Sequence, residues 1–179
     1  VIKMGTKRVG LARTQALIQN LKRELQMNGA TLAGVKLPYA NVTANTTLAA
    51  ADSGKLYIFN DADGATLTLP DSGGGDLIGW YIDVVCAVTA TSNQHKVICS
   101  DTTNEDLVGN FLNVDTDTSD AVACFPAIQA DGFDFVQFDG STTGIMGTTC
   151  RITNIKADLW LVEGLQVVTG SPATPFGST

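Results

Sequence analysis

The only histidine of the sequence, His95, is the first residue to test for chemistry, because nucleophilic catalysis needs a nucleophile, a base and an orienting group. His95 lies in an alternating segment in which Val97 and Cys99 share its face. The sequence has no Gly-x-Ser-x-Gly motif. The nearest pattern, Gly140-Ser-Thr-Thr-Gly144, has the wrong spacing and falls in a predicted turn. We therefore predict no catalytic residue and a protein that is not an enzyme.

Carboxylates are the second candidates, because paired carboxylates serve glycosidases and oxygen-rich loops bind calcium. The sequence has 15 Asp and three Glu, and Asp favours turns, as in Asp139-Gly140. The segment Asp115–Asp120 spaces its carboxylates as a calcium loop does. However, Asp120 and Pro126 stand where an EF-hand loop has glycine and glutamate. A solvated loop is the prediction and a calcium site the alternative.

The sequence also lacks the motifs of zinc and nucleotide sites. The four cysteines are spaced too widely for a zinc knuckle, and we predict free thiols buried in strands, with a disulfide as the alternative. The run Gly73-Gly74-Gly75 is followed by Asp76 rather than by a lysine, so it is a turn and not a phosphate loop. We predict no metal and no cofactor. The cysteines are Cys86, Cys99, Cys124 and Cys150.

Charge is divided unequally along the 179 residues. Residues 1–36 carry seven basic residues and one acid, Glu24, which gives +6. Residues 37–179 carry four basic and 17 acidic residues, which gives −13, so the total is −7. An acidic body repels nucleic acid, so binding of nucleic acid is not expected. No stretch approaches the ~20 consecutive apolar residues of a membrane span, so no membrane association is expected.

The N-terminal region is predicted to be an attachment element over residues 1–29. Its apolar residues between 10 and 28 recur at helical spacing and form one stripe, which predicts an amphipathic helix that ends at Asn28-Gly29. Such a short helix must pack on its own domain or on a partner. The candidate contacts with a partner are Lys7, Arg8, Leu11, Arg13, Leu17, Ile18, Leu21, Lys22 and Leu25.

The remainder is predicted to be mainly β, as a single β-sandwich, a jelly-roll-like domain or a small barrel. Residues 30–54 form a polar linker, residues 55–168 a body of about ten short strands, and residues 169–179 an extended tail. Besides 56–59, 66–69 and a long strand from Trp80, strands are expected at 95–99, 111–114, 121–125, 133–138, 150–155, 158–162 and 165–168.

The order of these segments resembles the decoration, or cement, proteins on the capsids of tailed bacteriophages. The resemblance rests on the basic arm and helix, on Ala65-Thr-Leu-Thr-Leu-Pro70 with its glycine-rich turn, on Phe138-Asp-Gly140, on Trp160-Leu-Val-Glu-Gly164 and on the tail. It implies a β-rich domain, often a homotrimer, that binds the major capsid protein on the outer surface of the virion and stabilises the lattice. It carries over no catalytic residue.

Two alternatives remain open. One is a fibre or tail-associated module that binds receptors or glycans, in which exposed Trp80, Trp160 and Tyr81 stack on sugars. For these aromatic residues, packing in the core is the favoured interpretation. The other is a small hydrolase with carboxylates clustered in a groove.

Overall fold

The computed structural model describes Gln15, residues 36–116 and residues 122–179. The chain divides into two compact units, residues 1–36 and residues 37–179. All nine candidate contact residues of the predicted attachment element lie outside the described residues, as does most of the predicted helix. All strands found in the described residues belong to the second unit.

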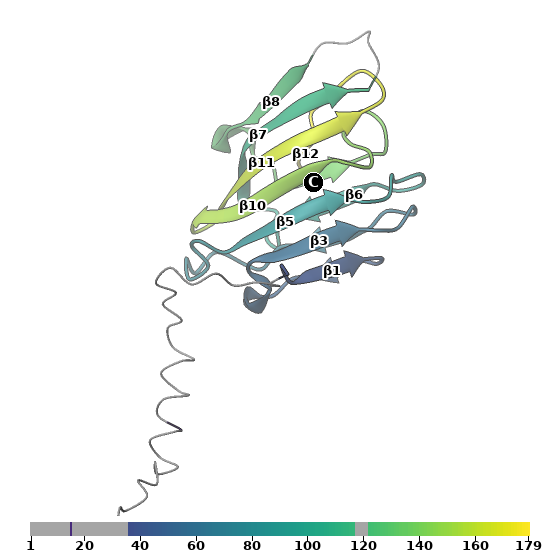
Figure 1. Ribbon diagram of the computed structural model, residues 1–179. Helices are drawn as coiled ribbons and strands as arrows, with labels where there is room; N and C mark the ends of the chain where they lie inside the picture. The colour runs from purple at the N-terminus through teal and green to yellow at the C-terminus, as the bar shows by residue number, and fades with distance from the viewer. Residues whose placement is uncertain (1–14, 16–35, 117–121) are drawn as a thin grey trace, which may run out of the picture. The chain divides into compact units, whose positions relative to one another are not determined.

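Seven strands form the larger sheet, in the order β1-β3-β5-β10-β11-β7-β8. Figure 1 shows them in this sequence, from β8 at one edge to β1 at the other. The sheet is mixed: β1, β3 and β5 run parallel, β10 is antiparallel to β5 and β11, β11 is parallel to β7, and β8 is antiparallel to β7. The strands span Tyr39–Val42 (β1), Lys55–Phe59 (β3), Tyr81–Cys86 (β5), Asp106–Asp115 (β7), Ala123–Ala127 (β8), Thr149–Lys156 (β10) and Leu159–Val168 (β11).

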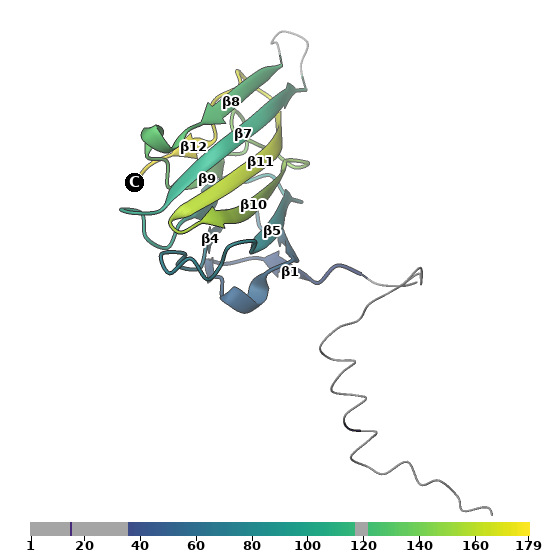
Figure 2. The ribbon, with the colours of Figure 1, turned by 90° about the vertical axis from the view of Figure 1, so that its left-hand side faces the viewer.

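Five shorter strands form the second sheet, in the order β12-β9-β6-β4-β2, of which β9, β4 and β12 are labelled in Figure 2. The first six strands alternate between the two sheets. Each time the chain returns to a sheet, it adds the next strand beside the previous one and runs in the same direction. This winding explains why β2, β4 and β6 are parallel, like β1, β3 and β5. The bounds are Thr46–Thr47 (β2), Thr66–Thr68 (β4), His95–Ile98 (β6), Phe135–Phe138 (β9) and Phe176–Gly177 (β12), with 3-10 turns at Ala50–Asp52 (η1) and Gln129–Asp131 (η2).

The core contains the inward side chains of both sheets, and the prediction of a mainly β, sandwich-like domain is confirmed. Strand β5 shows the principle, because its residues alternate between buried and half-buried positions as a period of two requires. Aromatic rings fill the interior, and four pairs of them meet edge to face, a preferred geometry for two quadrupoles. The ring centroids of Trp80 and Trp160 are 5.4 Å apart, and those of Phe111 and Phe138 are 6.0 Å apart.

The predicted linker needs correction from residue 37 onward. Strands β1 and β2 and the turn η1 all fall within 37–54, and β1 pairs in parallel with β3. The prediction of an extended tail over residues 169–179 also needs correction, because β12 lies within this range and pairs with β9. These strands are short and carry little apolar periodicity of their own. They form because the sheet edge offers unpaired backbone groups, which no local pattern reveals.

Two strands predicted at 158–162 and 165–168 are a single strand, β11. Gly164 stands between the two predicted segments, and a glycine inside a strand can mark a weak point or a bend. The structure gives another reason for the glycine: a β-carbon at this position would lie 2.1 Å from the ring of Phe111. Gly164 therefore makes room for a core side chain and does not end the strand.

Candidate interaction surfaces

His95 occupies a packed position in the interior on β6. Its side chain is almost fully buried, its Nε2 lies 2.9 Å from the carbonyl oxygen of Val88, and its ring stacks on Phe59 with centroids 4.5 Å apart. Burial lowers the pKa of His95, against the opposing effects of the Val88 carbonyl and Asp61. The imidazole is held neutral between core groups, which is the arrangement of a structural histidine.

Glu105 is a buried carboxylate that the sequence did not single out. Its Oε1 accepts hydrogen bonds from the Ser72 N–H (2.8 Å), the Ser72 hydroxyl (2.6 Å) and the Trp160 indole N–H (3.3 Å). Its Oε2 accepts from the Ser100 hydroxyl and the Asp101 N–H, both at 3.0 Å. Burial raises the pKa of Glu105, but these donors outweigh it and the net shift is downward. With both oxygens occupied, the carboxylate joins two loops to β11.

Several aspartates hold turns, as their sequence context predicted. Asp139 Oδ1 accepts from the backbone N–H groups of Ser141 and Thr143, and Asp71 Oδ1 accepts from the Gly73 N–H. Among the described residues, no group of three or more His, Cys, Asp or Glu is placed to hold a metal ion. Asp117 and Asp120 of the alternative calcium loop lie outside those residues.

All four cysteines are free thiols. Cys86, Cys99 and Cys150 are buried, and burial raises the pKa of Cys86 to about 12. The prediction of burial is wrong for Cys124, which is exposed because it points outward from β8, an edge strand of the larger sheet.

Both tryptophans belong to the core, which confirms the favoured interpretation of these side chains. Trp80 and Trp160 are buried, so neither offers a ring for stacking on a sugar. Tyr81 is half-buried on the opposite side of β5, and the Arg151 guanidinium carbon lies 4.8 Å from its ring centroid.

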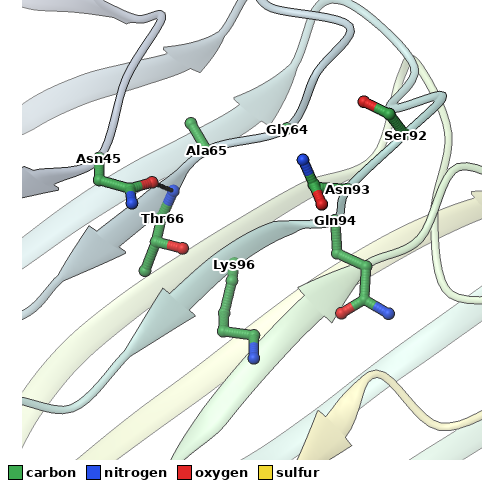
Figure 3. A pocket seen from close by; sticks show the side chains of 8 residues that line it. All are labelled: Asn45, Gly64, Ala65, Thr66, Ser92, Asn93, Gln94 and Lys96. Carbon is green, nitrogen blue, oxygen red and sulfur yellow. Dashed lines mark hydrogen bonds between the residues drawn. The ribbon is translucent and has the colours of Figure 1, made fainter.

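A polar hollow of about 440 Å³ lies beside β4 and β6 (Figure 3). Amides, hydroxyls and one ammonium group line it, and Figure 3 shows the side chains of Gln94 and Lys96 extending on the same side of it. The Lys96 Nζ also lies 3.9 Å from the ring centroid of Phe135. The lining residues are Asn45, Gly64, Ala65, Thr66, Ser92, Asn93, Gln94 and Lys96.

Hydrogen bonds between two loops hold this polar hollow in shape. The Thr91 N–H donates to the Ala62 carbonyl at 2.8 Å and the Asn93 N–H to the Asp63 carbonyl at 3.3 Å. Gly64, with φ of +80°, permits this approach, because a β-carbon there would lie 2.8 Å from the backbone carbonyl carbon of Asn93. A preformed hollow of amides and hydroxyls can hydrogen-bond a polyhydroxylated ligand without first being ordered.

The outward side of the larger sheet, called here the outer face, carries a row of charges at its centre. The cross-strand neighbours Asp83, Arg151 and Glu163 lie side by side on β5, β10 and β11. Arg151 donates from Nε and Nη2 to the two carboxylate oxygens of Asp83, at 2.8 and 2.9 Å. A shallow depression of about 520 Å³ surrounds these residues.

Apolar side chains flank the charged row. The next row along the strands reads Ile58, Val85, Thr149, Leu165, Leu112 and Cys124, from β3 to β8. On the other side lie Tyr81, Thr153, Leu161 and Val108.

Comparison with protein-family models, with curated proteins and with solved structures gave no match. The described part of the chain holds no helix with the length and apolarity of a membrane span.

Proposed function

We propose that this chain is a capsid decoration protein, a non-enzymatic component of a virion that binds the assembled lattice of major capsid protein from outside and stabilises it. The observation that carries the proposal is the order of segments: a +6 segment with one apolar stripe precedes a −13 two-sheet β unit. Such a chain suits attachment through a cationic, amphipathic element and a rigid body that keeps its surface in solvent.

The interior of the body supports a scaffolding role. Its buried histidine and the buried carboxylates of Glu105 and Asp134 hydrogen-bond to backbone, loop or C-terminal groups. A decoration protein needs distributed contacts on a stable framework, and it needs no pocket for a reaction.

Removal of the attachment element tests the proposal. Purified full chain and a variant lacking residues 1–28 are mixed with undecorated capsids, and the bound copies per capsid and the temperature of capsid disruption are measured. We expect the deletion to abolish binding and the gain in capsid stability. Undiminished binding by the shortened chain would contradict an attachment role for residues 1–28.

Charge variants separate the basic residues from the apolar stripe. Lys7→Gln, Arg8→Gln, Arg13→Gln and Lys22→Gln together should weaken capsid binding and reduce its dependence on salt, because exposed charge pairs are screened by ions. Lys156→Gln, an exposed site on the body, is the control and should leave binding unchanged.

A second function, glycan binding by a fibre or tail-associated module, is favoured by one observation, the preformed polar hollow. If it holds, Gln94→Ala and Asn93→Ala should reduce binding to host surface polysaccharide, whereas an exposed amide elsewhere, Asn104→Ala, should not. Location on the particle separates the two functions: many copies spread over the shell indicate decoration, and few copies at one vertex or on the tail indicate a fibre.

A further inference from the structure

The outer face of the larger sheet is more apolar than a solvent-facing sheet surface should be. Leu112 is 45% exposed and Leu165 and Val114 are each 39% exposed, and the exposed Cys124 and Pro126 continue the surface onto β8. Sheets with one solvated face normally alternate apolar and polar residues. A contiguous apolar surface of this kind on a folded unit marks a site of contact.

The size of this surface is that of a protein interface. Six strands, β3 to β8 in sheet order, span about 29 Å at ~4.8 Å each, and three rows of outward residues span about 20 Å along the strands. The projected area of about 600 Å² is comparable with the roughly 800 Å² that each partner of a stable complex buries.

The pattern of residues on this face is complementary to itself. Consider two copies whose outer faces meet, related by a two-fold axis that runs parallel to the strands and passes midway between β10 and β11. Each strand then faces a different strand of the second copy: β10 faces β11, β5 faces β7, and β3 faces β8. Arg151 would then face Glu163 of the second copy, and Val85 would face the second copy's Leu112. Opposite charges therefore meet at the centre of the charged row. In the flanking rows the facing side chains are apolar except on β10, where Thr149 and Thr153 would face Leu165 and Leu161 of the second copy.

The charged row has the free capacity that this pairing needs. The guanidinium group has five N–H donors, and Arg151 directs Nε and Nη2 toward Asp83, which leaves the donors of Nη1. Glu163 is exposed on β11. Within the facing row, Asp83 would lie opposite the side-chain amide of Asn110, which can donate to it.

We propose that the outer face of the seven-stranded sheet is a self-association interface, at which two copies of this chain pack face to face about a two-fold axis along β10 and β11. The inference does not depend on the proposed capsid function. It can fail while capsid binding holds, because it is tested on the purified chain alone.

Chemical cross-linking tests the geometry. In the two-fold arrangement Ile58 faces Cys124 of the second copy, and Cys124 is the only exposed native thiol. Facing sheets lie ~10 Å apart, too far for a disulfide, so a short bismaleimide is the appropriate reagent. Ile58→Cys should give a covalent dimer. The native chain should give no covalent dimer, because the Cys124 residues of the two copies would lie five strand spacings apart. Thr47→Cys, at an exposed position on β2 of the second sheet, is the matched control.

Disruption of the face tests the energetics by sedimentation equilibrium on the full chain. Leu165→Asp lies on the surface, so the fold should be retained, and it should raise the dissociation constant of the dimer by about 30-fold or more, as loss of a central contact does. Thr47→Asp, at an exposed position on β2 of the second sheet, should leave the constant unchanged.

The proposal is overturned if the chain is monomeric at all concentrations, as it would be if the capsid alone covered this face. It is also overturned by a trimer, the state that the resemblance implies, or by a dimer that survives Leu165→Asp unchanged. Failure of Ile58→Cys to cross-link in a dimeric chain would overturn the two-fold geometry.

Discussion

Replacement of the buried carboxylate of Glu105 by an amide should destabilise the body strongly while hardly changing its volume. The carboxylate accepts five hydrogen bonds, three at Oε1 and two at Oε2. In Glu105→Gln, the amide oxygen can keep one set of donors, and the Nε2 group then faces the other. If Nε2 replaces Oε2, the Ser100 hydroxyl can rotate to accept a bond, but the Asp101 N–H is left without its acceptor.

The expected loss of stability follows from these contacts. A buried N–H without an acceptor costs about 1–3 kcal/mol. The bonds that remain lose the added strength of a charged acceptor, which makes hydrogen bonds roughly twice as strong as neutral pairs. We therefore expect Glu105→Gln to reduce the free energy of unfolding by about 3 kcal/mol at neutral pH. The exposed Asp76→Asn removes the same charge and should change it by less than about 0.5 kcal/mol.

The effect should depend on pH in one direction. The pKa of Glu105 is lower in the folded chain than its ordinary value of 4.5, so the unfolded chain takes up the proton first. The stability that the carboxylate contributes is therefore fully present above pH 4.5 and is lost as pH falls through the lower, folded pKa. The difference between native chain and Glu105→Gln should shrink over the same window.

Guanidinium unfolding, followed by tryptophan fluorescence at a series of pH values, measures both quantities. Trp160 reports directly, because its indole N–H donates to Glu105. The reasoning is refuted if Glu105→Gln unfolds at the midpoint of the native chain. A difference that stays constant from neutral pH to well below pH 4.5 would refute the assignment of the effect to the ionised carboxylate.

Three further predictions use other parts of the body. Gly109→Ala should lower the free energy of unfolding, measured by thermal denaturation, by about 3 kcal/mol or more. The reason is that φ is +135° and a β-carbon would lie 1.9 Å from the Val162 carbonyl oxygen. Gly132→Ala, in open space at φ of +63°, is the control and should lower it by about 1 kcal/mol. Burial lowers the pKa of His95 in the folded chain, so the free energy of unfolding should fall as pH drops below 6.5 toward that folded pKa. His95→Gln should flatten this part of the plot of unfolding free energy against pH. An unchanged slope in the variant would contradict the assignment to His95. In the native state a thiol reagent should label Cys124 alone, and in denaturant it should label all four cysteines, as mass spectrometry can establish.

Strands with a strong period of two could be predicted from the sequence. The long strand from Trp80 was expected to direct Trp80, Ile82, Val84, Cys86 and Val88 to one side. The first four are buried, whereas β5 ends at Cys86 and Val88 is only half-buried. The turns were also predictable, because an Asp side chain beside a glycine both accepts local backbone hydrogen bonds and tolerates the tight conformation. These features are local, so neighbouring residues determine them.

Features that depend on distant residues could not be predicted. Strand β12 has two residues and forms only because β9 offers a partner. Glu105 stands among turn residues, and its burial depends on Ser72 and Trp160, which are 33 and 55 residues away. Cys124 was expected to be buried because strand-like apolar neighbours surround it, but its register with Leu112 places it on the outer face. In each case the deciding partner is remote in sequence.

The pattern of β11 connects the sequence to the proposed interface. The strand Leu159–Val168 is apolar on both faces, a pattern typical of strands covered on both sides. On its inward side Trp160 and Val162 are fully buried, whereas on its outward side Leu161 and Val167 are half-buried and Leu165 is exposed. Covering a leucine or valine side chain stabilises a complex by up to about 1.5–3 kcal/mol. Such side chains lie on the outward side of two neighbouring strands, β11 and β7, which favours the packing of another protein surface on them. In the proposed dimer that surface is the outer face of a second copy, whose charged row is complementary to the first.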